Sequence, residues 1–404
     1  MIIGVPGETE ENEDRVALIP PIADDLVEEG HDIVVASGAG EGADWKDADY
    51  EDVGCEVVDD RSEVFETAEA VLHVNGLGAS DDPDTDAYTD GQIVVGMLGP
   101  FSIEDDEMQA LADKNVSAFA LELMPRISRA QSMDALSSMA SIGGYKATMM
   151  AADELPKMFP MEMTAAGTVQ PADVFVIGAG VAGLKAIATS ERLGASTRGH
   201  DVRLEVKKEV ESLGAEFVEL ELPTEGSGDD EGYAVEMGEE FYEEQRRQME
   251  RVVPESDVLI TTAAIPGRPA PEIVTTEMIE EMDDGSVVVD LAAATGGNCE
   301  PTVADETVVH DGVKIFGPTN LPSRVSHTAS QLYSNNMKSF LDLLLPDGEL
   351  NIDLEDEIFD STLLTHDGEV RNPHIRDDGG GDGDDDDEEA ESDEDDEGEG
   401  EDDE

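Results

Sequence analysis

Apolar and polar residues alternate along this chain in blocks that predict repeated strand–helix units. Short apolar runs, typical of strands buried in a parallel sheet, are separated by amphipathic stretches. Up to residue 122 this alternation predicts one α/β unit. Its expected strands are Met1–Pro6, His31–Ala36, Ala70–Val74, Ile93–Leu98 and Val116–Ala120, and its expected helices are Pro21–Glu29, Tyr50–Gly54 and Ile103–Lys114.

A second series of strands and helices follows a long helical stretch over Ser138–Leu155. We therefore expect a doubly wound parallel sheet in this region of the chain. Its strands are Val174–Ile177, Ser196–His200, Glu216–Leu220, Val258–Thr262, Val287–Leu291 and Lys314–Phe316, with helices over Leu184–Leu193, Glu205–Leu213, Glu239–Val252 and Thr276–Met282.

The end of the chain is expected to return to the first unit. Ser326–Leu345 is a long helix with an apolar face, and His366-Asp367-Gly368 is a turn signal inside a hairpin-like end. The prediction is an α/β fold with two Rossmann-like domains and a cleft between them, the second a doubly wound parallel sheet. The first domain comprises residues 1–135 and 325–372, the second comprises 136–324, and 377–404 is a disordered acidic tail.

One segment, Ala172–Leu184, joins a strand to a glycine motif. Gly178, Gly180 and Gly183 are spaced G-x-G-x-x-G directly after an apolar run and directly before a helix. The first glycine permits a tight turn, the second lets the backbone approach a pyrophosphate, and the third lets the helix pack closely on the strand. The alternative is a glycine-rich turn that binds nothing, but the strand, the glycines and the helix are all in register.

Asp201 ends the next predicted strand, where an acid can accept hydrogen bonds from the adenosine ribose hydroxyls. A carboxylate there also repels a 2′-phosphate, which favours NAD over NADP, although Arg203 lies two residues on and weakens that preference. The loops Thr262–Pro271 and Asp290–Asn298 follow other strand ends, where ligands bind in such folds.

The charge of the chain is extreme. It has 23 basic against 99 acidic residues, a formal net charge of −76, and its last 28 residues hold 20 acids without a lysine or arginine. The first 376 residues still carry −56. Such a surface repels itself at low salt, whereas multimolar salt shortens the Debye length to a few ångströms. We therefore expect a cytosolic protein of an extreme halophile, and not a nucleic-acid binder.

Cysteine and hydropathy patterns agree with a cytosolic location. Cys55 and Cys299 are isolated and lack metal-ligand spacing, so neither a disulfide nor a metal site is expected. The N-terminus shows no signal-peptide pattern, and no run of about 18 apolar residues is present.

A polar stretch before the long helix, Pro125–Lys146, is the second candidate site. Arginines 126 and 129, with Gln131, Asp134, Ser137 and Ser138, form a dense polar set in an arginine-poor chain. The set is compatible with a capped helix N-terminus and a solvated face. The two arginines within four residues favour a loop that holds a nicotinamide carboxamide and ribose.

Together these motifs resemble the NAD-binding α subunit (domain I) of the proton-translocating NAD(P) transhydrogenases, a family that shares its fold with alanine dehydrogenase. The resemblance covers about Met1–Asn372. It is carried, in chain order, by Arg15–Leu18, Arg126–Ser138, Gly178–Leu184, Ile265–Gly267 with Ala270–Pro271, and Pro318–Pro322.

The resemblance implies roles for individual residues. The family's nicotinamide-lining arginine, glutamine, aspartate and serine correspond to Arg126, Gln131, Asp134 and Ser137. Its mobile-loop tyrosine corresponds to Tyr233, within Gly232-Tyr233-Ala234, and its ribose-binding acid to Asp201. The expected cofactor-binding set is Gly178, Gly180, Val181, Ala182, Gly183, Asp201, Val202, Arg203, Tyr233 and Ala264.

The resemblance also implies an activity and partners. The chain would transfer hydride between NAD(H) and an NADP(H) bound on a partner subunit. Because no transmembrane pattern is present, the proton channel and the NADP(H)-binding β subunit are expected on separate, membrane-embedded chains. This chain would then be cytoplasmic, peripheral at the inner face of the cell membrane, and a homodimer to which the helix Ser326–Leu345 could contribute.

Two other functions remain open. An alanine dehydrogenase-like enzyme would carry a catalytic lysine after the strand where this chain has His73-Val74-Asn75, and a catalytic histidine near Val95–Phe101, where none occurs. His73 on a strand is more often structural than catalytic. Arg15 is either a surface ion-pair partner or an anion-contacting residue. The other alternative is a non-catalytic NAD-binding protein.

Overall fold

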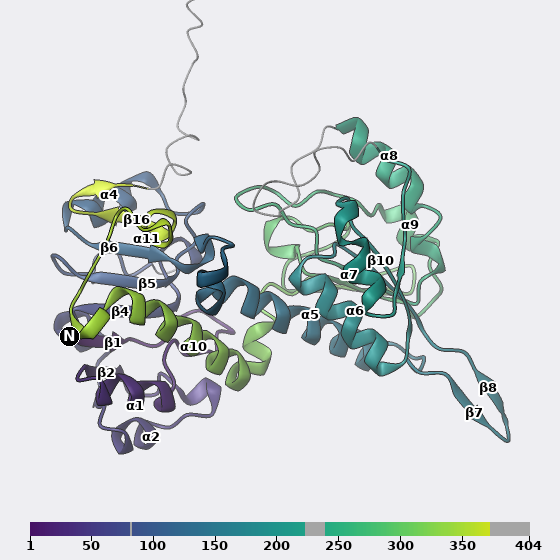
Figure 1. Ribbon diagram of the computed structural model, residues 1–404. Coiled ribbons are helices and arrows are strands. Elements are labelled where there is room, and N and C mark those ends of the chain that lie inside the picture. The colour runs from purple at the N-terminus through teal and green to yellow at the C-terminus, as the bar shows by residue number, and fades with distance from the viewer. Residues whose placement is uncertain (81–82, 223–238, 372–404) are drawn as a thin grey trace, which may run out of the picture. The chain divides into compact units, whose positions relative to one another are not determined.

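The computed structural model describes residues 1–80, 83–222 and 239–371, and it forms two α/β domains, each built on a parallel-rich sheet (Figure 1). The first sheet has the order β17-β16-β6-β5-β4-β1-β2-β3. Its strands are β1 (Ile2–Val5), β2 (Asp32–Ala36), β3 (Glu56–Val58), β4 (Ala70–Asn75), β5 (Ile93–Met97), β6 (Ser117–Ala120), β16 (Leu363–His366) and β17 (Glu369–Val370).

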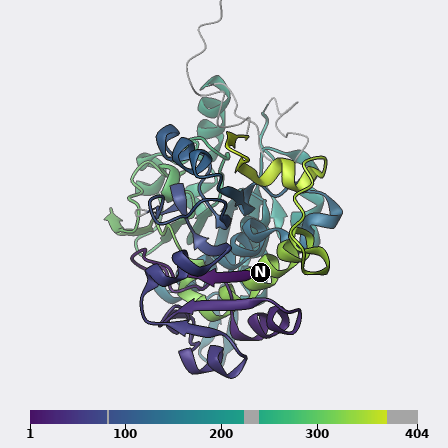
Figure 2. The same ribbon diagram turned by 90° about the vertical axis from the view of Figure 1, so that its left-hand side faces the viewer.

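The C-terminal strands complete the first sheet. β16 pairs antiparallel with β6, and β17 pairs antiparallel with β16, while the other strands are parallel. Figure 2 shows the yellow C-terminal segment within the domain that holds the purple N-terminal strands. The helices of this domain are α1 (Pro20–Glu28), α2 (Asp47–Asp52), α3 (Arg61–Thr67), α4 (Asp105–Asp113), α10 (Ser326–Leu344) and α11 (Glu357–Thr362).

The second sheet has the order β11-β10-β9-β12-β13-β15-β14 and is parallel except for its edge strand β14. Its strands are β9 (Asp173–Ile177), β10 (Ser196–His200), β11 (Glu216–Phe217), β12 (Val258–Thr261), β13 (Val287–Asp290), β14 (Thr307–His310) and β15 (Val313–Phe316). Its helices are α6 (Val181–Leu193), α7 (Lys207–Ser212), α8 (Glu239–Met249) and α9 (Thr276–Glu280).

The central strands β9, β12 and β13 of the second sheet are buried on both faces, which explains why they are nearly continuous apolar runs. In β9, Val174 and Val176 pack into a core with side chains of α6 and of α5 (Ala135–Glu154). Phe175 and Ile177 point to the opposite core, which α8 and α9 cover.

The long helix α10 packs on the first sheet, as expected. Tyr333, Met337 and Phe340 are fully buried in the first core, although Leu332 remains 39% exposed. Since β16 and β17 join the same sheet, we propose domain limits of 1–135 with 325–372, and 136–324.

Several short elements were not predicted. They are β3, α3, α11, the edge strand β14, and a hairpin of β7 (Glu162–Thr164) and β8 (Gly167–Val169). The expected strand Glu216–Leu220 ends at Phe217, and the helix placed at Tyr50–Gly54 lies at Asp47–Asp52. These elements have two to seven residues, too few to show a period above noise. Within the described ranges, no helix is long and apolar enough to cross a membrane.

Candidate functional site

The glycine loop between β9 and α6 adopts the geometry that its spacing predicts. Gly178 has φ +92°, a left-handed conformation that strongly favours glycine. A Cβ on Gly183 would lie 1.8 Å from the Gly178 carbonyl oxygen, so only glycine allows this close approach. At Gly180 a Cβ would meet nothing within 4 Å, so the backbone there borders open space before the N-terminus of α6.

Side chains from β12 and beyond hold this loop in place. The Thr262 hydroxyl donates to the carbonyls of Ile177 and Gly178 at 3.3 and 3.2 Å. Asn298, fully buried, exchanges hydrogen bonds with the backbone of Ala263 at 2.9 and 2.8 Å. The buried carboxylate of Asp290 in turn accepts from the backbone of Asn298 at 2.7 Å. The Asp290–Asn298 loop therefore supports the site and does not line it.

Asp201 ties the end of β10 to the glycine loop. Its carboxylate accepts from the Ala179 backbone at 2.7 Å and from the Arg203 guanidinium at 2.9 and 2.8 Å. Burial alone would raise the pKa of Asp201, but the hydrogen bonds and charge of Arg203 lower it, so the group is ionised. The expected ribose acceptor is thus already paired with Arg203, and a ribose would share the carboxylate or displace the guanidinium.

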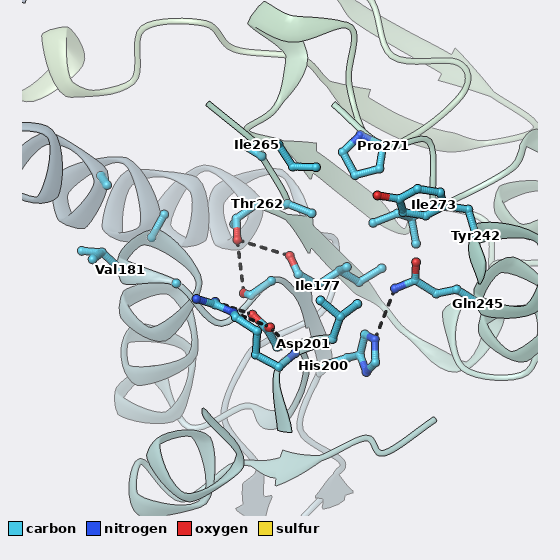
Figure 3. A pocket seen from close by; sticks show the side chains of 18 of the residues that line it. Ile177, Val181, His200, Asp201, Tyr242, Gln245, Thr262, Ile265, Pro271 and Ile273 are labelled. Atoms are coloured by element: carbon cyan, nitrogen blue, oxygen red, sulfur yellow. Dashed lines mark hydrogen bonds and ion pairs between the residues drawn. The ribbon is translucent and has the colours of Figure 1, made fainter. Parts of the chain in front are cut away.

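One pocket gathers most of the predicted cofactor residues, together with two residues of the polar set before and at the start of α5 (Figure 3). It brings Arg126 and Ser137, far apart in sequence from the glycine loop, to the same cavity. Its lining is Arg126, Leu136, Ser137, Ala140, Ile177, Gly178, Gly180, Val181, Ala182, His200, Asp201, Val202, Arg203, Phe241, Tyr242, Gln245, Thr262, Ala263, Ala264, Ile265, Pro271 and Ile273.

The remaining residues of the polar set have other places. Asp134 caps α5, and its carboxylate accepts from the Ser137 backbone at 2.8 Å, which is the capping interpretation of this motif. Gln131 is exposed, and neither it nor Asp134 lines the pocket. Arg129 pairs with Asp356 at 2.6 Å, in the segment that returns to the first domain.

One other predicted cofactor residue falls outside the pocket lining, and another lies outside the described residues. Gly183 is absent from the lining because its role is the close packing described above. Tyr233 lies outside the described residues, as does the acidic tail.

The sequence analysis did not identify the pocket side chains of α8, and it placed Thr262 in a ligand-binding loop without the loop-holding role of its hydroxyl. Phe241, Tyr242 and Gln245 of this helix line the pocket. They are spaced at i, i+1 and i+4, so the helical period alone could have placed Phe241 and Gln245 on a common face. Which neighbour that face meets depends on the tertiary fold.

The two candidate residues of the first domain are buried. Arg15 is 5% exposed and pairs with Glu13 at 2.5 Å. The expected ion pair is therefore present, but it is buried and does not lie on the surface. Glu13 also accepts from the amides of Asn75 and Asn320 at 2.9 and 2.8 Å. Burial would raise the pKa of Glu13, but the hydrogen bonds from Arg15 lower it.

His73 has a structural environment. It is 1% exposed, and its Nε2 lies 3.1 Å from the Tyr88 hydroxyl. Burial lowers the pKa of His73 to about 4, so the ring is neutral at physiological pH. Neither His73 nor Arg15 lines the pocket.

Comparison with known proteins gives the same picture for both domains of the chain. Residues 4–143 match the model of the alanine dehydrogenase/PNT N-terminal domain, and residues 147–373 match that of the alanine dehydrogenase/PNT C-terminal domain. The NAD(P) transhydrogenase subunit alpha of Haemophilus influenzae is 43% identical over 92% of this chain and 72% of its own length.

A solved structure agrees as well. The transhydrogenase from Sinorhizobium meliloti superposes with a TM-score of 0.79 at 38% identity, covering 93% of this chain and 100% of that one. An alanine dehydrogenase from Halomonas elongata is more distant, at 31% identity over 92% of this chain and 94% of its own length.

Proposed function

Since this chain belongs to the alanine dehydrogenase/PNT family, we propose that it is the NAD(H)-binding α subunit of a proton-translocating NAD(P) transhydrogenase. It would pass hydride between NAD(H) in the pocket and NADP(H) on a partner subunit. The observation that carries this proposal is the pocket in which the glycine loop and Asp201 meet Arg126 and Ser137. In this proposal the glycine loop and Asp201 take the pyrophosphate and the adenosine, and Arg126 and Ser137 take the nicotinamide.

The nicotinamides themselves supply the hydride chemistry, so the protein needs to bind, orient and exclude water. Gly180 and the N-terminus of α6 offer backbone N–H groups to a pyrophosphate. Arg126 and Ser137 would orient the nicotinamide, and Gln131 and Asp134 would join them if the segment before α5 shifts. Tyr233 would close over the bound cofactor.

The polar groups of the first domain do not favour the oxidation of an amino acid such as L-alanine. The stretch His73-Val74-Asn75 has no lysine where the resemblance implies a catalytic one, and the Asn75 amide donates to Glu13. Arg15 is engaged by the same carboxylate, and His73 is neutral and buried. We therefore expect no turnover of L-alanine.

The names of the relatives, which describe an α subunit, support partner subunits for this chain as well. We propose that it works at the inner face of the cell membrane against membrane-embedded subunits that include an NADP(H)-binding β subunit. The acidic surface fits a halophile's cytoplasm.

A homodimer completes the proposal, but α10 is a poor candidate for its interface because its apolar face is already buried in the first core. The β7–β8 hairpin is better suited, since it projects from its domain and leaves Met161, Met163 and Val169 about half to three-quarters exposed, at 54%, 72% and 48% (Figure 1). A lone two-stranded hairpin is at best marginally stable in water, so a second copy would stabilise it.

The test is a hydride-transfer assay in multimolar potassium chloride. NADPH and an oxidised NAD analogue are given to the purified chain alone and with membranes that hold its partner subunits, and L-alanine with NAD is assayed in parallel. Transfer that depends on the partner, without alanine turnover, is the expected result. Alanine-dependent NAD reduction by the chain alone would overturn the proposal, and NADH binding without transfer to any acceptor would favour a non-catalytic NAD-binding protein.

A further inference from the structure

One side chain in the part of the pocket lining that α8 contributes has an unmet hydrogen-bonding requirement. Gln245 of α8 is 1% exposed, and its amide oxygen has no hydrogen-bond partner among the described residues. A buried acceptor without a partner is destabilising, so its presence in a pocket wall calls for a ligand that donates to it.

His200 determines whether the nitrogen or the oxygen of the Gln245 amide faces away from the histidine ring. Nδ1 of His200 lies 2.8 Å from the Val218 carbonyl oxygen, which can only accept, so Nδ1 carries the proton. Burial lowers the pKa of His200, so the ring is neutral and its Nε2 is an acceptor. The Gln245 nitrogen, 3.4 Å from that Nε2, must therefore donate to it. The amide oxygen then lies on the side away from His200, toward Ile273 (Figure 3).

The surroundings of this oxygen fit a flat, largely apolar ring with an amino group. Ile177, Val202, Pro271 and Ile273 contribute apolar walls, and Phe241 and Tyr242 contribute aromatic ones. His200 immediately precedes the ribose-binding candidate Asp201, so this part of the pocket is where the base attached to that ribose would lie.

From this geometry we propose that Gln245 is the residue that selects adenine, because its amide oxygen accepts a hydrogen bond from the exocyclic amino group of the base. His200 is the positioning residue, since it holds the amide in the accepting orientation. The Gln245 amide oxygen is buried by its neighbours, and we expect the half-buried Tyr242 to turn as the base enters. The inference rests on the proposed function only in taking NAD(H) as the ligand of this pocket.

The test compares NADH with reduced nicotinamide hypoxanthine dinucleotide, which carries a carbonyl in place of the amino group. Both are titrated against the purified full chain in multimolar potassium chloride, with the nicotinamide fluorescence as the signal. Wild-type protein should bind NADH at least tenfold more tightly, because a carbonyl facing the Gln245 oxygen is repelled. Equal affinity for the two dinucleotides would overturn the inference.

Variants separate Gln245 from general effects on the pocket. Gln245→Met keeps the length of the side chain without its oxygen, and should bring the affinity ratio close to one. His200→Leu removes the acceptor that orients the amide, so Gln245 can rotate and the ratio should fall in the same way. Gln248→Met, on the same helix but outside the pocket lining, should keep the wild-type ratio. A ratio that stays tenfold in Gln245→Met would also refute the proposal.

The two proposals fail in distinguishable ways. If the wild-type chain binds neither dinucleotide, the proposed function itself fails. If it binds both equally, NAD binding stands and only the role of Gln245 is lost.

Discussion

Replacing Gly144 with alanine should weaken both the fold and the cofactor site, because α5 crosses the N-terminus of α6 at this residue. A Cβ on Gly144 would lie 2.0 Å from the Ala182 carbonyl oxygen. A carbon and a carbonyl oxygen normally come no closer than about 3.3 Å, so the two helices must separate locally by roughly 1.3 Å. Overpacking of this kind costs about 1–3 kcal/mol of unfolding free energy.

The same displacement reaches the pocket, since Ala182 lines it. A shift of about 1 Å at a reacting site can lower a rate by up to about 10²-fold. We therefore expect Gly144→Ala to unfold at lower denaturant concentration, to bind NADH more weakly, and to lose most hydride transfer.

Gly143 provides a matched control on the same helix. A Cβ there meets nothing within 4 Å, so Gly143→Ala should be neutral or stabilise by about 0.5–1 kcal/mol through its better helix propensity. Denaturant unfolding and NADH titration in multimolar potassium chloride measure both variants. If Gly144→Ala matches Gly143→Ala in stability and in NADH affinity, the close helix contact is refuted.

Three further changes test other regions of the chain. Burial raises the pKa of Glu122 from 4.5 to about 7, so its folded form holds a proton that the unfolded chain releases, and unfolding free energy should fall from pH 4.5 to 7 by up to about 1.4 kcal/mol per pH unit. Glu122→Gln should flatten that slope in denaturant titrations. Asp201→Ala should leave Arg203 at the pocket without its carboxylate, lowering NADH affinity and raising NADPH affinity by about tenfold relative to NADH in fluorescence titrations. Met163→Asp on the exposed hairpin should shift the chain from dimer to monomer in light scattering at high salt.

Each of these expectations has a clear contrary result. A Glu122→Gln variant with the wild-type pH slope would show that this carboxyl titrates normally. An unchanged NADH-to-NADPH preference in Asp201→Ala would show that the carboxylate does not select the cofactor. For the hairpin, Thr168→Ser at a neighbouring exposed position should remain dimeric, and a dimeric Met163→Asp would place the interface elsewhere.

The sequence by itself predicted the local features of this protein, namely its strands, its glycine turn and a helix cap. The strand–helix alternation predicted most of both sheets, because a strand buried on both faces needs an uninterrupted apolar run, as in β9. The glycine spacing predicted the turn at Gly178 and the close packing at Gly183, because these depend on the absence of a Cβ within a few residues. The cap at Asp134 was likewise visible as an alternative interpretation of its motif.

What the sequence could not determine is which distant side chains meet. Arg126 and Gln245 line the same pocket as the glycine loop, from segments before and after it, and Glu13 joins Arg15, Asn75 and Asn320 in one hydrogen-bonded set. Only the tertiary structure shows that Asp201 is paired with Arg203 and that an amide oxygen of α8 lies without a partner among the residues described. The physical reason is that periodicity and backbone conformation act over a few residues, whereas burial, hydrogen-bond partners and ionisation depend on neighbours that the packing of whole elements brings together.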